Sequence, residues 1–307
     1  MNNMDRLFDA VAEKGHVCVG LDTAAAHVPP GARAGLGDAQ AALAYNKALI
    51  DATGDVAACF KAQIAYYEEM GLAGLSAYAQ TLAYAREKGR LIIADVKRGD
   101  IAETARAYAR AHFSGDFEAD FVTLSPYMGI DTLEPWLEEA AARGKGAFVL
   151  TRTSNPGARD FQDLQADAPG GKRPLYKAVA DRLAELALSG ERSRSGERGY
   201  GLFGAVVGCP DSRESAEIRE KYPNLFFLIP GYGAQGAGAS EAALLLREGN
   251  GGVVNASRSI IAAWKSRLPE SEATIEAAAG CAREAAIEMR DAIRAAIAAS
   301  AAIVARP

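Results

Sequence analysis

The chain has few cysteines and no surplus of positive charge. Only 4 of its 307 residues are cysteine, and they form neither a C-x-x-C pair nor a dense framework. This argues against a disulfide scaffold or a structural zinc site, and we expect reduced core cysteines in a cytoplasmic protein. The formal net charge of −5 excludes an extended electrostatic surface for nucleic acid and a polybasic membrane patch.

Long apolar runs and histidine clusters are also missing. The sequence contains no run of about 18 apolar residues, so it predicts no membrane span. Its first residues, MNNMDRLFDAVAEKG, lack a basic flank followed by an apolar stretch, and we expect no signal peptide. The 3 histidines are scattered and offer neither a triad nor a metal-ligand spacing, so we expect them to be structural or surface residues.

Short apolar runs recur along the chain, with helix-like stretches rich in Ala, Leu, Glu and Arg between them. The runs are 17–21, 56–60, 91–95, 121–124, 147–151, 202–207, 225–229 and 252–255. Such runs are typical of strands buried on both faces of a parallel sheet. The alternation predicts an α/β fold, a (β/α)8 TIM barrel in a single domain over 1–307. A doubly wound open sheet is the alternative, but no G-x-G-x-x-G turn follows the early runs.

Two segments depart from this alternation. A long insertion at about 159–200 separates the fifth and sixth runs, and we expect in it a helix around 174–188 and a polar loop at 189–199. The second segment is the Ala-rich tail, which predicts a C-terminal helix from about residue 270.

Polar residues follow the predicted strands, where a barrel of this kind places its active site. In DVKRGDI the residues Asp95 and Lys97 have i, i+2 spacing, so on an extended strand they point the same way. A structural ion pair is the alternative interpretation of these two residues. Asp100 is placed either for chemistry or as a helix N-cap, with Glu103 completing a capping box.

Six motifs in the same order resemble those of the orotidine 5′-phosphate decarboxylases. They are VGLD at Asp22, FKAQIAYYE around Lys61, DVKRGDI, RTSNPG at 152–157, PGYGAQG at 230–236 and ASRSI at 256–260. The resemblance spans roughly residues 5–265, and the long insertion is similar to that of the longer bacterial members of the family. It implies decarboxylation of orotidine 5′-phosphate to UMP in de novo pyrimidine biosynthesis, without cofactor or metal.

The resemblance implies a catalytic chain of alternating charges. Lys61, Asp95, Lys97 and Asp100 would form this chain, with Asp100 supplied by the partner subunit of a homodimer with shared active sites. The ammonium group of Lys97 would stabilise negative charge at C6 and then donate a proton to it.

The resemblance also implies contacts to the nucleotide substrate. Asp22 and Lys61 would bond the ribose hydroxyls, together with Thr104 from across the dimer, and Ser154 would contact the base. The phosphate would be held by Gln235, Ser257 and Arg258, under a Gly-rich loop that begins at Pro230. Tyr232 in this loop would cover the ligand.

Two other functions are compatible with the D-x-K-x-x-D pattern. One is a Mg²⁺-dependent sugar-phosphate decarboxylase or synthase, although Lys61, Ser154 and Gln235 together suit a nucleotide better. The other is a phosphate-binding barrel without activity, against which the complete set of charged residues argues.

Overall fold

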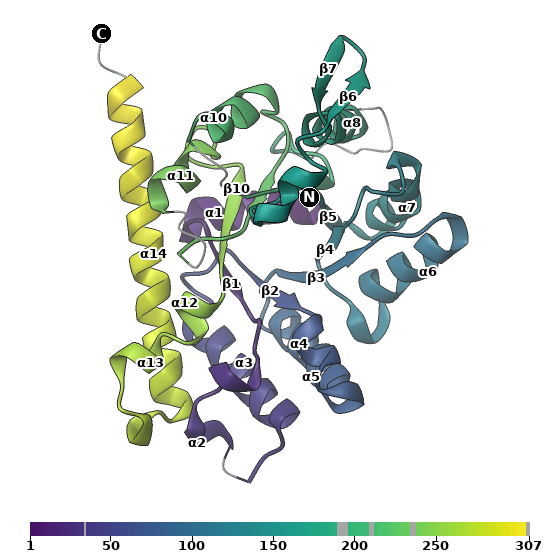
Figure 1. Ribbon diagram of the computed structural model, residues 1–307. Helices are drawn as coiled ribbons and strands as arrows, with labels where there is room; N and C mark the ends of the chain where they lie inside the picture. Colours follow the sequence, from purple (N-terminus) through teal and green to yellow (C-terminus); the bar gives the residue numbers. More distant parts are fainter. Residues whose placement is uncertain (34, 189–195, 209–211, 234–237, 305–307) are drawn as a thin grey trace.

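Eight parallel strands close into a barrel in the part of the chain that the structure describes (Figure 1). This computed structural model describes residues 1–33, 35–188, 196–208, 212–233 and 238–304. The barrel strands are β1 (Val17–Gly20), β2 (Cys59–Gln63), β3 (Ile92–Arg98), β4 (Phe121–Leu124), β5 (Gly146–Arg152), β8 (Phe203–Val207), β9 (Phe227–Ile229) and β10 (Gly252–Ala256). They follow the order β1-β10-β9-β8-β5-β4-β3-β2 around the barrel, so their carboxyl ends meet at one rim.

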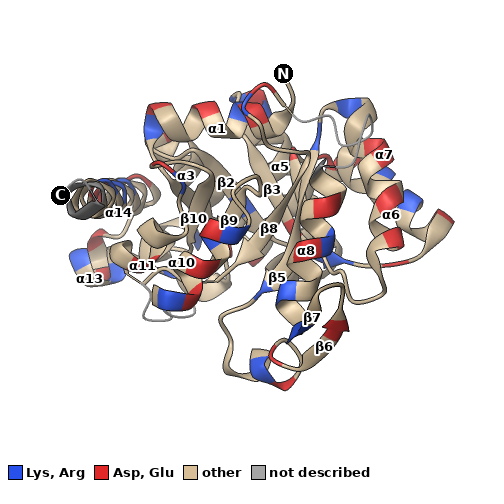
Figure 2. Cartoon of the chain, turned by 90° about the horizontal axis from the view of Figure 1, so that it is seen from above, with Lys and Arg blue, Asp and Glu red and all other residues tan. Residues whose placement is uncertain are grey.

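Helices surround the barrel and connect its strands. The longer ones are α1 (Asn3–Lys14), α3 (Asp38–Thr53), α5 (Gly71–Glu87), α6 (Ala102–Phe113), α7 (Glu134–Arg143), α8 (Leu175–Leu188), α10 (Ser212–Lys221) and α14 (Ile275–Val304). Short helices are α2 (Pro30–Arg33), α4 (Ala65–Glu68), α11 (Ala239–Leu244), α12 (Arg258–Ile261) and α13 (Trp264–Arg267), and 3-10 turns lie at Ala25–His27, Gly115–Phe117, Ile130–Leu133, Pro156–Asp160 and Glu270–Glu272. Seen from above, the labelled barrel strands lie inside the helices, with α14 end-on at the margin (Figure 2).

The predicted barrel is confirmed, although the second strand is displaced from the expected 56–60. The amides of Val56 and Ala57 donate to the carbonyl of Thr53, so these residues form the turn after α3. β2 therefore begins at Cys59 and ends at Gln63. As a consequence, Lys61 lies within β2 and not after its last residue, and its side chain points into the barrel.

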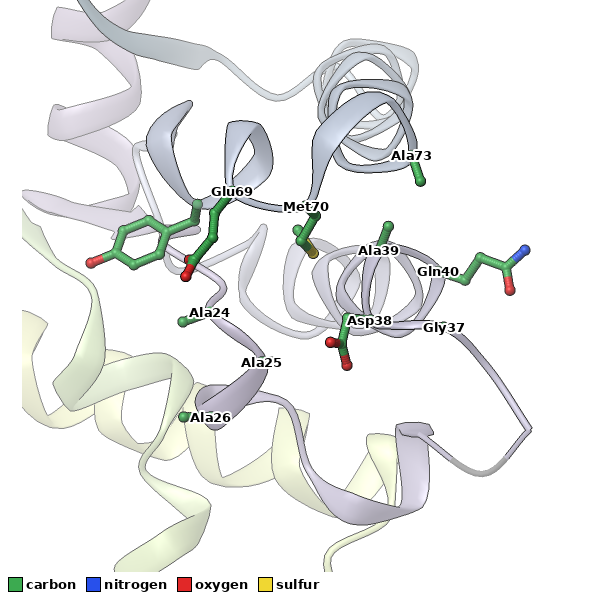
Figure 3. A pocket seen from close by; sticks show the side chains of 11 residues that line it. Ala24, Ala25, Ala26, Gly37, Asp38, Ala39, Gln40, Glu69, Met70 and Ala73 are labelled. Atoms are coloured by element: carbon green, nitrogen blue, oxygen red, sulfur yellow. The ribbon is translucent and has the colours of Figure 1, made fainter.

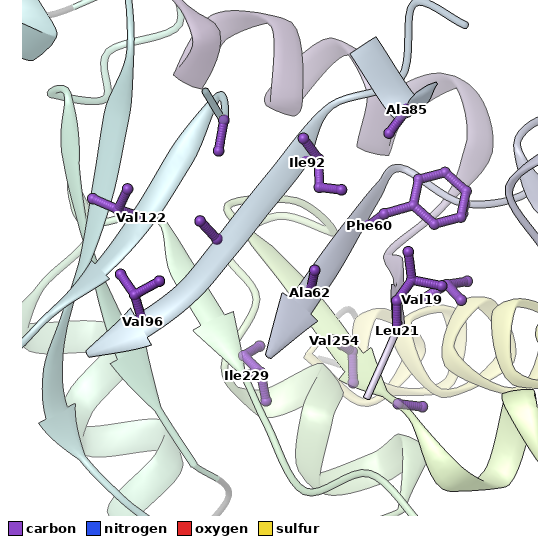
Figure 4. Packing of buried hydrophobic residues seen from close by; sticks show 14 of the residues in the cluster. Val19, Leu21, Phe60, Ala62, Ala85, Ile92, Val96, Val122, Ile229 and Val254 are labelled. Atoms are coloured by element: carbon purple, nitrogen blue, oxygen red, sulfur yellow. The ribbon is translucent and has the colours of Figure 1, made fainter. Parts of the chain in front are cut away.

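One apolar layer fills the space between the strands and the surrounding helices. Alternate strand residues such as Phe60 and Ile92 point outward, where they join helix residues such as Tyr45 and Ala85. Figure 4 shows part of this layer, with Phe60 and Ile92 directed from the sheet toward Ala85 of α5. Burial of the outer face explains why the strands read as continuous apolar runs.

A second apolar cluster fills the barrel interior and includes one helix. The inward-facing strand residues include Ile93, Phe121, Phe148, Phe226 and Val253. From α1, the side chains Met4, Leu7 and Val11 join the same cluster and are at most 2% exposed. Helix α1 therefore closes the end of the barrel opposite the carboxyl rim.

The insertion contains an antiparallel hairpin that the sequence analysis did not predict. Strands β6 (Gln165–Ala168) and β7 (Gly171–Pro174) pair with each other and project beside α8 (Figure 1). Their turn places Gly170 and Gly171 at φ +88° and +115°, which residues other than glycine rarely adopt. The expected helix at 174–188 is found as α8, whereas residues 189–195 of the expected loop lie outside the described residues.

The described cysteines and two of the histidines are buried in the fold. Cys18, Cys59 and Cys281 are free and buried, while Cys209 lies outside the described residues. His16 and His112 are buried within the fold, at 5% and 3% exposure. The expected C-terminal helix begins at Ile275 as α14. Within the described residues, no helix is long and apolar enough to cross a membrane.

Candidate active site

A cavity of about 210 Å³ opens at the carboxyl rim of the barrel. Its lining residues come from the ends of several strands and from the loops that follow them. They are Lys61, Asp95, Lys97, Thr123, Leu150, Thr153, Ser154, Asn155, Val206, Leu228, Pro230 and Asn255. The polar members stand at one end of an otherwise apolar interior, so a ligand there meets fixed charges beside an apolar wall.

Strand alternation explains how these side chains reach the cavity. Side chains two residues apart on a strand point to the same face. Lys61, Asp95 and Thr123 each lie two positions after an apolar residue of the barrel interior, and Asn255 does the same after Val253. On these four strands the inner layer of the barrel thus changes from apolar to polar in a single step toward the rim.

Three charged side chains form a continuous chain in this cavity. The Lys61 ammonium donates to Asp95 Oδ2 at 2.9 Å, and the Lys97 ammonium donates to Asp95 Oδ1 at 2.6 Å. Lys61 also donates to Asp22 Oδ1 at 3.3 Å. The side chains of Lys61 and Asp95 are 6% and 9% exposed, whereas that of Lys97 is 47% exposed. Lys97 is therefore the member of the chain that a ligand can reach most easily.

The charges in this chain stabilise one another. Burial lowers the pKa of Lys61, but the carboxylates of Asp95 and Asp22 more than offset this and raise it above its usual range. Burial likewise favours the neutral form of Asp95, yet Lys61 and Lys97 hold the pKa of Asp95 well below its usual value. Both groups are therefore ionised at neutral pH, which gives the cavity a fixed pattern of charge.

The structure brings some of the predicted substrate-binding residues into this cavity. Ser154 and Pro230 line it, and Asp22 reaches it through Lys61. Ser257 lies next to it, because its hydroxyl accepts a hydrogen bond from the side-chain amide of Asn255 at 3.4 Å.

The predicted phosphate end lies at the start of α12, directly after β10. Arg258 is the first residue of this helix and is exposed, so its guanidinium is accessible from solvent. Gln235, the other side chain predicted to hold phosphate, lies outside the described residues.

Asp100 and Thr104 lie apart from the cavity within this chain. Asp100 accepts a hydrogen bond from the amide of Ile101 at 2.8 Å, and Thr104 is exposed on α6. The alternative interpretation of Asp100 as a helix N-cap is wrong, because Ile101 occupies that position and no side chain caps the helix. The expected capping box with Glu103 is accordingly not formed.

Thr123 and Asn255 are polar residues of the cavity to which no role was assigned from the sequence. Both were contained in runs interpreted as strands, where a single threonine or asparagine carries little signal. The signal that identifies them is position: each is the next inward-facing residue after a core side chain, Phe121 or Val253.

A wider groove of about 750 Å³ lies between the β1–α3 connection and the α4–α5 segment (Figure 3). Figure 3 shows Asp38 and Glu69 among the side chains around this groove, and no lysine or arginine is among the 11 residues that line it. Among the described residues that line this groove, an anionic ligand finds no cation, so we assign the candidate active site to the smaller cavity. In the described part of the chain, no group of three or more His, Cys, Asp or Glu residues is placed to hold a metal ion.

The fold and the cavity together define a class of protein. It is a (β/α)8-barrel protein whose ionised lysine and aspartate side chains meet at the carboxyl rim, where barrel enzymes carry their active sites. A family model described as "Orotidine 5'-phosphate decarboxylase / HUMPS family" matches residues 15–273. The chain belongs to this family.

Relatives and solved structures agree with this assignment. A protein of Clostridium acetobutylicum named orotidine 5′-phosphate decarboxylase is 52% identical over 292 residues, which cover 95% of this chain and 98% of that protein. A relative of the same name from Clostridium perfringens is 50% identical over 294 residues, with coverage of 95% and 98%. The solved structure of Leishmania donovani OMP decarboxylase is 32% identical, has a TM-score of 0.74 and covers 97% of this chain and 99% of that one.

Proposed function

We propose that this enzyme removes CO2 from C6 of orotidine 5′-phosphate to give UMP, a step of de novo pyrimidine biosynthesis. The names of its relatives support the substrate. The observation in this chain that carries the proposal is the continuous chain Lys61–Asp95–Lys97 in the cavity at the barrel rim. The sugar-phosphate alternative is not favoured, because the relatives described above are named for the nucleotide reaction.

Lys97 supplies the chemistry at C6 in this proposal. When the bond between C6 and the carboxylate breaks, CO2 leaves and the electron pair stays at C6 in the plane of the ring. That orbital cannot delocalise into the ring, so a fixed positive charge is the available means of stabilisation. The ammonium of Lys97 stabilises the developing negative charge and then transfers a proton to C6.

Asp95 and Lys61 hold Lys97 in place. Asp95 bonds both lysines through its two oxygens, which fixes the position of the Lys97 ammonium. A substrate carboxylate placed about 4 Å from Asp95 would be repelled by roughly 4 kcal/mol at an effective dielectric constant near 20. The two lysines offset that repulsion, so we assign the larger share of catalysis to Lys97.

The remaining polar residues bind the rest of the nucleotide in this proposal. Ser154 faces the base, and Asp22 bonds the ribose together with Lys61. Ser257 and Arg258 lie at the rim after β10 and hold the phosphate, where barrels often bind this group. Gln235 and the loop that follows Pro230 complete the phosphate site, and Tyr232 covers the ligand. No cofactor or metal takes part.

We also propose a cytoplasmic homodimer with shared active sites. Asp100 and Thr104 lie outside the cavity of their own chain, which suits a contribution to a neighbouring one. Apolar side chains at the same rim are exposed, including Ile101 at 55%, Tyr127 at 87% and Met128 at 51%. A second copy of the chain would cover these side chains while bringing Asp100 toward the partner's lysines.

The proposal is tested by following the ultraviolet absorbance of orotidine 5′-phosphate in excess EDTA. We expect the wild type to form UMP at full rate without metal. Lys97→Ala should lower turnover by orders of magnitude, because the acid is lost, while binding of UMP remains measurable. Absence of UMP formation by the wild type, or activity that requires Mg²⁺, would refute the assigned reaction.

A further inference from the structure

An irregular stretch of β3 lies beside a single residue of β4. Ala94 is paired with Val122, and the next pairing joins Arg98 to Leu124. Three residues of β3, from Asp95 to Lys97, therefore face one residue of β4, which is Thr123. This bulge contains both members of the Asp95–Lys97 pair, so the geometry of the pair depends on how the bulge is held.

Lys97 has an unusual backbone conformation within the bulge. Its φ angle is +45°, a left-handed value that residues other than glycine seldom adopt. Such a conformation persists only where surrounding contacts enforce it, and it is common at functional sites. Because of this turn, the Lys97 ammonium meets the carboxylate of Asp95 at 2.6 Å instead of continuing along the strand.

The hydroxyl of Thr123 supplies those contacts and uses its full bonding capacity. It accepts hydrogen bonds from the amides of Val96 at 3.0 Å and Lys97 at 2.9 Å. It also donates its only proton to Asp95 Oδ1 at 2.9 Å. A hydroxyl has one donor and two acceptor positions, and all are occupied here. Thr123 is 1% exposed, so water cannot replace it.

We propose that Thr123 is a positioning residue, which fixes the bulge of β3 and thereby keeps the ammonium of Lys97 and the carboxylate of Asp95 in register with the substrate. This inference rests on the proposed function, because it assumes the roles given to the two charged residues. Thr123 acts through them: it replaces the backbone carbonyls that a regular β4 would offer, and it binds the same Asp95 oxygen as Lys97.

Thr123→Val tests the role with nearly the same side-chain shape. The substitution leaves two buried amides without an acceptor and removes one donor from Asp95. The bulge then lacks the hydrogen bonds that hold its conformation. We expect kcat to fall roughly 10- to 100-fold, because part of the cost of the three lost hydrogen bonds falls on the placement of Lys97. The affinity for UMP should change little, because the product lacks the group at C6 that needs the lysine. Thr123→Ser retains the hydroxyl and should restore most of kcat.

Thr151→Val is the matched control. Thr151 is buried on the neighbouring strand β5, and its hydroxyl donates to Val149 of the same strand at 3.0 Å. This variant removes a threonine hydroxyl from the same barrel without touching the charged chain, so its kcat should stay near that of the wild type. Circular dichroism of each variant establishes that the barrel is folded before rates are compared.

The pH profile separates positioning from a general loss of stability. Loss of the hydrogen bond to Asp95 Oδ1 makes its carboxylate easier to protonate, although Lys61 and Lys97 still face it, with Asp22 beyond Lys61. The acid limb of kcat/KM should therefore move to higher pH in Thr123→Val and return in Thr123→Ser.

The possible outcomes are distinct. An unchanged kcat in folded Thr123→Val, or a Thr123→Ser variant as slow as Thr123→Val, would overturn the positioning role while leaving the proposed function intact. Equal losses in Thr151→Val and Thr123→Val would also overturn it. A wild type that forms no UMP would instead reject the proposed function itself.

Discussion

At the scale of single residues, Lys61 is a lysine that keeps its charge where almost no water reaches it. Its side chain is 6% exposed, and a lysine buried alone would release its proton. Asp95 and Asp22 raise its pKa instead, so the charge persists. Lys61 and Asp95 therefore depend on each other: without Asp95, Lys61 keeps only Asp22 as a countercharge, and without Lys61, Asp95 keeps only Lys97.

His112 makes stability depend on pH in a way that can be predicted. It is 3% exposed beside the rings of Phe117 and Trp136, and burial together with Arg98 lowers its pKa from 6.5 to about 4. Between these values the unfolded chain binds a proton that the folded chain does not. The free energy of unfolding therefore falls as the pH drops from about 6.5 to 4.

His112→Phe should remove this part of the pH dependence. Between pH 7 and pH 5 the wild type should lose about 2 kcal/mol more of unfolding free energy than the variant, at 1.36 kcal/mol per pH unit. Urea denaturation at both pH values measures the difference, and the other titrating groups cancel in the comparison. Equal losses in the two proteins would show that His112 is charged in the fold or accessible to protons.

The sequence predicted the charged residues of the site but not what holds them. The spacing in DVKRGDI placed Asp95 and Lys97 together, as the structure does. It did so for a partly mistaken reason, since the two residues meet through a bulge and not along a regular strand. The bulge depends on the pairing of β3 with β4, and Thr123 lies 28 residues from Asp95 in sequence. A partner so distant in sequence cannot be predicted from the spacing of residues within one short motif.

At the scale of secondary-structure elements, Arg152 joins the end of β5 to the insertion and to α10. Its guanidinium donates to Asp163 at 2.7 Å and to Glu214 at 3.3 Å, and it lies 4.7 Å from the ring centre of Tyr176. The side chain of Arg152 is 9% exposed. Residues 153–155, which line the cavity, follow directly after it. One buried cation thus links three segments to the wall of the site.

Arg152→Met should loosen this connection. We expect the free energy of unfolding to fall by roughly 3 kcal/mol, because the acidic partners lose their cation, and KM to rise because the wall of the cavity shifts. Arg213→Met is the control: Arg213 is 90% exposed and pairs with Glu217 on α10, so its loss should cost less than about 1 kcal/mol. Thermal unfolding and steady-state kinetics of both variants measure the effects. Equal stability of the two variants would contradict the proposed role of Arg152 in linking these segments.

The hairpin β6–β7 is a secondary-structure element that was not predicted from the sequence. Its strands are four residues each and only partly buried, and they lack the run of large apolar or β-branched residues by which strands are recognised. The signal that was available is the turn, since Pro169 and Gly170 lie between the strands and Gly171 begins the second one. By contrast, α8 was predicted correctly, because its apolar residues recur with helical period.

At the scale of the whole molecule, the proposed shared site predicts complementation between inactive variants. Asp100→Ala and Lys97→Ala homodimers should each be inactive. Mixed and allowed to exchange subunits, they should regain part of the wild-type activity, because a hybrid dimer has one site with both native residues. The activity of the mixture is measured over time alongside each variant alone. No recovery, with exchange verified by mass spectrometry of differently tagged chains, would argue against a shared site.

The barrel itself was predictable because its strands are buried on both faces. Outer residues such as Val122 contact the helices, and inner residues such as Phe121 fill the interior, so each strand appears as an uninterrupted apolar run. Alternation of these runs with helical segments leaves few possible topologies. The ends of strands were less predictable, as Val56 and Ala57 show, because a turn can use apolar residues as readily as a strand can.

The helix that seals the base of the barrel has a consequence for biosynthesis. Met4, Leu7 and Val11 precede β10 in the chain, yet the cluster that covers them includes Val253, and the cylinder closes only when β10 pairs with β1. During synthesis these apolar side chains therefore stay uncovered until β10 has been made. A fragment that ends before β10 should accordingly expose this apolar surface and fail to form the closed barrel.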